Sequence, residues 1–132
     1  MRDTIRTLLQ DTATWAVVGL SPDPARDSHR IARLLQSRGK RVIAVNPHCT
    51  EVLGERAYPS LGELPAGTTV DVVDIFRRAD QAGAHVDEAI AIGARAVWMQ
   101  LGVVDEAAAQ RARDAGLLVV MDRCPAIEWP RL

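Results

Sequence analysis

The sequence predicts a single α/β domain, residues 1–132, in which helices on both faces cover a doubly wound parallel sheet of five strands. Three observations support this fold class. Short apolar runs rich in β-branched residues recur along the chain, as in strands that are buried on both sides. Helical patterns separate these runs, and a glycine stands between helix and strand at three joints. The length of 132 residues fits one domain.

The five expected strands are short and lack strict alternation of apolar and polar residues. They are Trp15–Gly19, Arg41–Val45, Val70–Ile75, Ala96–Met99 and Leu117–Met121. Repeated helix-glycine-strand joints imply parallel strands connected by right-handed crossovers. We therefore expect one sheet in which the five runs, numbered along the chain, take the order 3-2-1-4-5.

Apolar residues at helical spacing predict four helices between and before these strands. They cover Asp3–Gln10, Ser28–Arg38, Ala79–Gly93 and Asp105–Ala115. A glycine then falls where a helix commonly ends in a left-handed residue, at Gly39, Gly93 and Gly116. The stretch Pro47–Thr69 is rich in proline and glycine, so we expect an irregular connection with one short helix near Ser60–Leu64.

Composition excludes several classes of partner. The chain has 16 basic and 17 acidic residues and a formal net charge of −1, whereas duplex-binding proteins usually carry a basic excess, so no nucleic acid is expected. No apolar run approaches the length of a membrane span. Two cysteines without a CxxC pair suit a reducing cytoplasm, and the three histidines lack metal-ligand spacing. We expect a cytoplasmic protein with a small-molecule ligand.

The loop after the first expected strand is a candidate phosphate site. It runs from Gly19 to Ser28 and opens a helix, whose free N–H groups and partial positive charge favour an anion. Gly19 would let a ligand approach the backbone, and Arg26 could add a guanidinium. Ser21 stands where the dinucleotide fingerprint has its second glycine. The alternative is a tight turn at Gly19, an N-cap at Asp27 or Ser28 and a surface charge at Arg26, and the loop alone does not decide between them.

The loop after the second expected strand argues against NAD. Dinucleotide enzymes usually place an acidic residue there to bind ribose hydroxyls, and this chain has Asn46 followed by Pro47. Asn46 could bind a ribose or an adenine edge. An Asn-Pro turn without a ligand is the alternative interpretation.

The loops after the third and fourth expected strands complete the candidate site. Phe76, the chain's only phenylalanine, could stack on an adenine, and Arg77 and Arg78 could meet a ribose phosphate. Gly102, two residues after Gln100, would let a ligand approach the backbone. The competing interpretations are a core phenylalanine, a solvated helix start and a plain turn.

Five stretches in this order resemble one family. They are VVGLSPDPARDSHRIARLL, RVIAVNP, DVVDIFR, VWMQLGV and VMDRCPAIE. Together they resemble the small stand-alone CoA-binding proteins of bacteria, whose domain is also found in the α subunit of succinyl-CoA synthetase. The resemblance implies a Rossmann-like fold with coenzyme A as the bound cofactor. It implies a phosphate loop lined by Gly19, Ser21, Arg26 and Ser28, a nucleotide bordered by Asn46 and Pro47, an adenosine flanked by Ile75, Phe76 and Arg77, and a pantetheine path bordered by Gln100 and Gly102.

No side chains make a convincing catalytic set. The order of residues supports no Ser-His-Asp arrangement, and Cys124 has only Arg123 as a charged neighbour in sequence, which favours a structural thiol. We therefore expect a module that binds CoA or an acyl-CoA without catalysis of its own. The alternatives are an enzyme acting on an acyl-CoA or on NAD(P), and a regulatory protein whose ligand controls docking to a protein partner. The oligomeric state stays open.

Overall fold

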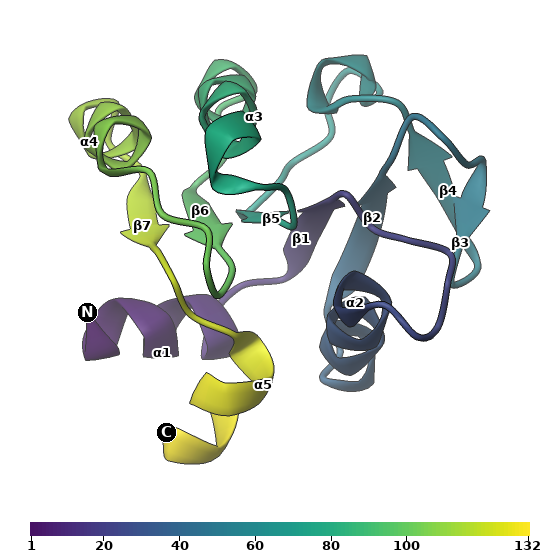
Figure 1. Ribbon diagram of the computed structural model, residues 1–132, viewed down its shortest axis with the longest axis horizontal. Coiled ribbons are helices and arrows are strands. Elements are labelled where there is room, and N and C mark those ends of the chain that lie inside the picture. Colours follow the sequence, from purple (N-terminus) through teal and green to yellow (C-terminus); the bar gives the residue numbers. More distant parts are fainter.

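A computed structural model describes residues 1–132 as one α/β domain with a central seven-stranded sheet (Figure 1). The strands are β1 (Thr14–Val18), β2 (Arg41–Val45), β3 (Glu51–Val52), β4 (Glu55–Tyr58), β5 (Val72–Ile75), β6 (Ala96–Met99) and β7 (Leu118–Val120). Their spatial order is β3-β4-β2-β1-β5-β6-β7. Every neighbouring pair is parallel except β3 and β4. The expected Rossmann-like α/β class is confirmed, and so is the parallel pairing of the first two strands.

Five α-helices and two 3₁₀ turns surround the sheet. They are α1 (Arg2–Gln10), α2 (Asp27–Ser37), α3 (Ala79–Ala91), α4 (Glu106–Asp114), α5 (Pro125–Glu128), and the turns η1 (Leu61–Glu63) and η2 (Trp129–Arg131). The helix-ending glycines have positive φ as predicted, at +83° for Gly39, +73° for Gly93 and +91° for Gly116. The short helix expected near Ser60–Leu64 is the turn η1. No helix has the length and apolar character needed to cross a bilayer.

The core lies in two layers, one on each face of the sheet. Helices α3 and α4 cover one face, and α1, α2 and α5 lie on the other (Figure 1). Side chains alternate along β1: Ala16 and Val18 face the α3–α4 side, and Trp15 and Val17 face the α1–α2 side. Burial of both faces explains why the strands read as continuous apolar runs.

The expected sheet of five strands in the order 3-2-1-4-5 is wrong in one respect. The third run pairs with β1, with Trp15 opposite Val72 and Val18 opposite Ile75, and does not pair with β2. The place beside β2 belongs to β4, within the stretch expected to be irregular. Strand β4 has the sequence ERAY, and because two of these residues are charged, it cannot be recognised as an apolar run. With β4 counted as the third parallel strand, the order becomes 3-2-1-4-5-6, the usual Rossmann order.

Candidate functional site

The carboxyl ends of the parallel strands meet at one edge of the sheet. Gly19 follows β1, Asn46 follows β2, Phe76 follows β5 and Gln100 follows β6. The chain leaves β1 toward β2 on one side of the sheet, and β5 begins the other side, so the strand order reverses between β1 and β5. Doubly wound sheets bind their ligands in the crevice at such a reversal.

Three open cavities lie at this edge, and Phe76 lines all of them. The loop cavity, of about 480 Å³, is lined by Gly19, Ser21, Ala25, Arg26, Asp27, Ser28 and Phe76. The central cavity, of about 710 Å³, lies between α2 and the loops after β5 and β6. The Asn46 cavity, of about 230 Å³, lies between the loops after β2 and β5. Because they share lining residues, we treat them as one groove.

Side chains of the first loop hold its backbone in shape. The Ser21 N–H donates to Ser28 Oγ at 3.0 Å, and Ser21 Oγ accepts from the Asp23 N–H at 3.1 Å. Asp23 Oδ1 in turn accepts from the Ala25 N–H at 2.9 Å. The loop is therefore ordered by its own hydrogen bonds, and Ser21 and Ser28 shape the loop cavity as well as line it.

The start of α2 opens into the loop cavity without a side-chain cap. Arg26 is the N-cap residue, in extended conformation, and no side chain accepts from the first turn. The expected alternative of an N-cap at Asp27 or Ser28 is thus wrong. The first N–H groups of a helix have no acceptor within the helix, and they attract anions. Residues Arg26, Asp27 and Ser28 all line the cavity, which places these donors at its wall.

Asn46 connects the loop after β1 with the loop after β2 through side-chain hydrogen bonds. Its Nδ2 donates to the Leu20 carbonyl at 2.9 Å, and its Oδ1 accepts from the His48 N–H at 2.8 Å. The side chain therefore stabilises the Asn-Pro turn and fixes the first loop beside it. Asn46 and Pro47 also line the Asn46 cavity.

Two buried polar atoms at the central cavity lack a hydrogen-bond partner. They are Gln100 Oε1 and Arg77 Nε. Gln100 is 7% exposed, and the Arg77 Nη2 donates to Gln81 Oε1 at 2.8 Å. Buried polar atoms are nearly always paired, so these two unpaired atoms make Gln100 and Arg77 candidates for contact with a polar ligand. Gly102 lies beside them with φ of +79° and with open space where a Cβ would stand.

The arginines around the groove differ in their partners. Arg30 forms an ion pair with Asp27, and Arg78 Nε lies 3.6 Å from Asp80 Oδ1. Arg26 and Arg77 take part in none of the protein's ion pairs. Their guanidinium groups are therefore available to an anionic ligand.

Of the expected site residues, only Ile75 stays away from the groove. Its side chain is fully buried in the α3–α4 layer of the core. One wall of the central cavity was not predicted from the sequence. This wall is a stripe on α2 formed by Asp27, Arg30, Ile31 and Leu34. The i, i+3, i+4, i+7 spacing of these residues is the signal that could have revealed the stripe. Cys124 and Ala126, near the start of α5, also line this cavity.

Asp74 is a buried acid close to the site but outside the cavity linings. It lies on β5 opposite Val17 of β1 and Trp98 of β6, is completely buried, and has no partner for either carboxylate oxygen. Burial in this apolar layer raises the pKa of Asp74 well above its ordinary value, because the charged form loses its hydration. Burial therefore favours the neutral form of this carboxyl.

Comparison with known families matches residues 13–130 to the CoA binding domain. The chain belongs to this family. The protein is similar to the uncharacterized protein YneT of Bacillus subtilis (strain 168). The two sequences are 38% identical over 91% of this chain and 87% of YneT. The resemblance inferred from the five sequence stretches is thus confirmed.

Solved structures share the fold of this CoA binding domain. A hypothetical protein from Pyrococcus horikoshii OT3 is 36% identical and superposes with a TM-score of 0.93 over 100% of this chain and 92% of its own. A dinucleotide-forming acetyl-coenzyme A synthetase from Ca. Korarchaeum cryptofilum is 25% identical, with a TM-score of 0.75 over 89% of this chain and 28% of its own. The latter shows the same fold within a much longer polypeptide.

Proposed function

We propose that the protein binds coenzyme A, free or acylated, in the groove around Phe76. The observation that carries the proposal is the continuity of this groove. It joins the uncapped start of α2, two arginines without acid partners and the unpaired oxygen of Gln100. These groups match the parts of CoA in chemical order, and membership of the CoA binding domain family supports the assignment.

The pyrophosphate would lie in the loop cavity. Free N–H groups at the start of α2 and the guanidinium of Arg26 supply donors and positive charge. Gly19 has φ of +83° and lies in the wall of this cavity. The adenosine would lie against Phe76, with Arg77 near its ribose phosphate. Asn46 and Pro47 would border the nucleotide from the Asn46 cavity.

The pantetheine arm would follow the central cavity past Gln100 and Gly102. The pantetheine arm contains amides. Its N–H groups could donate to the unpaired Gln100 Oε1, and its carbonyls could accept from the unpaired Arg77 Nε. The apolar stripe of Ile31 and Leu34 on α2 faces the same space. The proposal concerns binding alone and assigns no lining side chain a part in acyl transfer.

Competitive titration tests the identity of the ligand. Apo protein would be titrated by calorimetry with CoA, dephospho-CoA, NAD and NADP. We expect CoA to bind most tightly, followed by dephospho-CoA, which lacks the ribose phosphate that Arg77 would meet. Both dinucleotides should bind far more weakly, because the first loop lacks the second and third glycines that admit a dinucleotide. For NAD, the absence of an acid after β2 is a further reason. Tighter binding of NAD or NADP than of CoA would overturn the proposal.

A further inference from the structure

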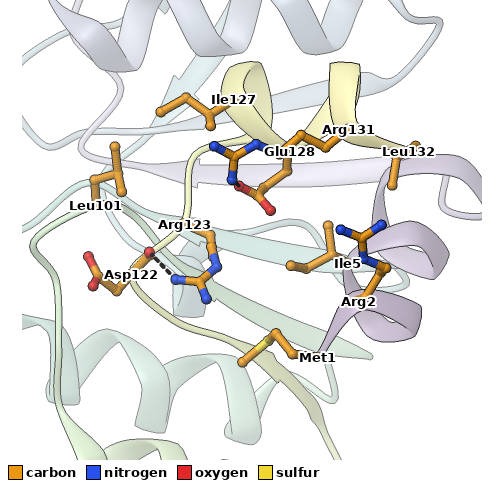
Figure 2. A pocket seen from close by; sticks show the side chains of 10 residues that line it. All are labelled: Met1, Arg2, Ile5, Leu101, Asp122, Arg123, Ile127, Glu128, Arg131 and Leu132. Atoms are coloured by element: carbon orange, nitrogen blue, oxygen red, sulfur yellow. Dashed lines mark hydrogen bonds and ion pairs between the residues drawn. The ribbon is translucent and has the colours of Figure 1, made fainter.

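A fourth cavity, separate from the three that form the groove, lies between α1 and the C-terminal segment. This α1–α5 cavity has a volume of about 460 Å³. Figure 2 shows its lining, with Arg123 extending between Leu101 and Ile5, and with Arg2 and Arg131 approaching from α1 and from the last turn of the chain. None of these residues belongs to the ligand site predicted from the sequence.

Positive charge without a carboxylate partner gathers in this cavity. Arg2 and Arg123 take part in none of the protein's ion pairs, and Arg123 Nη1 donates only to the Asp122 carbonyl, at 3.0 Å. The lining also contains two carboxylate side chains, Asp122 and Glu128, each with one partner, so its three arginines exceed its acidic side chains by one. Asp122 Oδ1 accepts from the Gly102 N–H at 2.8 Å, and Glu128 Oε2 lies 3.5 Å from Arg131 Nη1. Two guanidinium groups thus remain free to bind an anion.

Leu101 connects this cavity to the groove. Its half-exposed side chain lines both the central cavity and the α1–α5 cavity. Chain neighbours are divided between the two spaces: Cys124 and Ala126 line the central cavity, and Arg123 and Ile127 line the α1–α5 cavity. A ligand arm that leaves the central cavity past Leu101 therefore enters a space lined by Arg123, by the apolar side chains Ile5 and Ile127, and by Arg2 on α1.

We infer that the α1–α5 cavity receives the acyl group of an acyl-CoA that ends in a carboxylate. The inference rests on the proposed function, since CoA in the groove delivers the acyl group to Leu101. Methylenes of the acyl chain pack against the apolar walls, and the terminal carboxylate binds Arg123, while Arg2 adds positive charge on the α1 side of the cavity. A neutral acyl chain of equal length fills the same space and leaves both guanidinium groups without a partner. The ligand class is thus a dicarboxylic acyl-CoA.

Matched pairs of ligands test this assignment. Calorimetry under reducing conditions would compare succinyl-CoA with butyryl-CoA and glutaryl-CoA with valeryl-CoA, because the members of each pair have the same number of acyl carbons. We expect the dicarboxylic member of at least one pair to bind about tenfold more tightly, as for one charge-assisted hydrogen bond. The preference should shrink at high salt, since Arg2 lies exposed at the surface.

Substitutions of single arginines test which side chains cause the preference for the dicarboxylic member of each pair. Arg123→Gln and Arg2→Gln should each reduce the ratio of affinities within a pair toward one. Arg113→Gln should leave the ratio unchanged, because Arg113 is exposed on α4 and lines no cavity. Equal affinities within both pairs, or a preference that survives in both variants, would overturn the inference while unmodified CoA still binds. Failure of unmodified CoA to bind would instead overturn the proposed function, and this inference with it.

Discussion

Gly19 at the end of β1 lies directly against the carbonyl oxygen of Phe76 at the end of β5. A Cβ on Gly19 would stand 2.6 Å from that oxygen, and φ of Gly19 is +83°. The loops on the two sides of the strand-order reversal are therefore in contact through their backbones. This contact positions Phe76, which lines all three cavities of the groove.

Gly19→Ala should destabilise the protein more than the same change at Gly39. Both glycines have φ of +83°, but nothing lies within 4 Å of a Cβ at Gly39. Gly39→Ala therefore measures the backbone cost alone, about 1–3 kcal/mol. Gly19→Ala adds the clash with the Phe76 carbonyl, which we expect to cost about 1–3 kcal/mol more. Urea unfolding of both variants checks this, and equal losses would show that the Phe76 loop moves freely.

Arg26→Ala should weaken CoA binding by about 1–3 kcal/mol without affecting the fold. Arg26 is exposed, lines the loop cavity and has no ion-pair partner to lose. Arg33→Ala is the matched control, because Arg33 is exposed on the same helix and lines no cavity. Calorimetry compares the two variants, and unchanged affinity for Arg26→Ala would assign Arg26 to the surface alone.

Gln100→Leu should act in opposite directions on stability and binding. Gln100 Oε1 is buried without a partner, so replacing the amide with an apolar side chain should raise the free energy of unfolding by about 1 kcal/mol. The same change should weaken CoA binding, because the pantetheine arm loses its acceptor. Thermal unfolding with and without CoA measures both effects. A loss of stability in the free protein would mean that the amide already has a partner there.

Asp74 should make stability depend on pH. Burial raises the pKa of Asp74 well above its ordinary value of 3.8, so the folded protein keeps a proton that the unfolded chain releases. The free energy of unfolding should therefore fall as pH rises above 3.8, by about 1.4 kcal/mol per pH unit, until the folded-state pKa is reached. Asp74→Asn removes this titration and should gain stability over the wild type as pH rises.

Denaturant unfolding at a series of pH values measures this difference. Asp3→Asn provides the control, because Asp3 is exposed on α1 and takes part in no ion pair. A difference between Asp74→Asn and the wild type that stays constant with pH would show that Asp74 has an ordinary pKa in the folded state.

Strands β1, β2, β5, β6 and β7 could be predicted because each is a mostly buried apolar run. Strand β4 could not, since two of its four residues, Glu55 and Arg56, are charged and only Ala57 is fully buried. Missing β4 led directly to the wrong strand order. The order of a sheet depends on which strands pair, and the third apolar run alone did not reveal that another strand precedes it.

The candidate site was predicted from one topological rule, that ligands bind where parallel strands end. The rule selected loops that the structure brings together around one groove, but it does not say which way a side chain points. Ile75 and Phe76 are neighbours in sequence, yet Ile75 enters the core and Phe76 lines the groove. The contacts of Gly19 with Phe76 and of Asn46 with Leu20 join residues far apart in sequence, so no local pattern indicates them.

The short hairpin strand β3 has a consequence for solubility. An outer strand with a long unpaired edge can recruit strands of other molecules and start aggregation. Here the sheet ends in β3, which has only two residues and runs antiparallel to β4, and at the other side in β7, which has three. Neither edge offers enough free backbone to template an intermolecular ladder. We therefore expect a low tendency to form β-aggregates at high protein concentration, even though the sheet is built from strongly apolar strands.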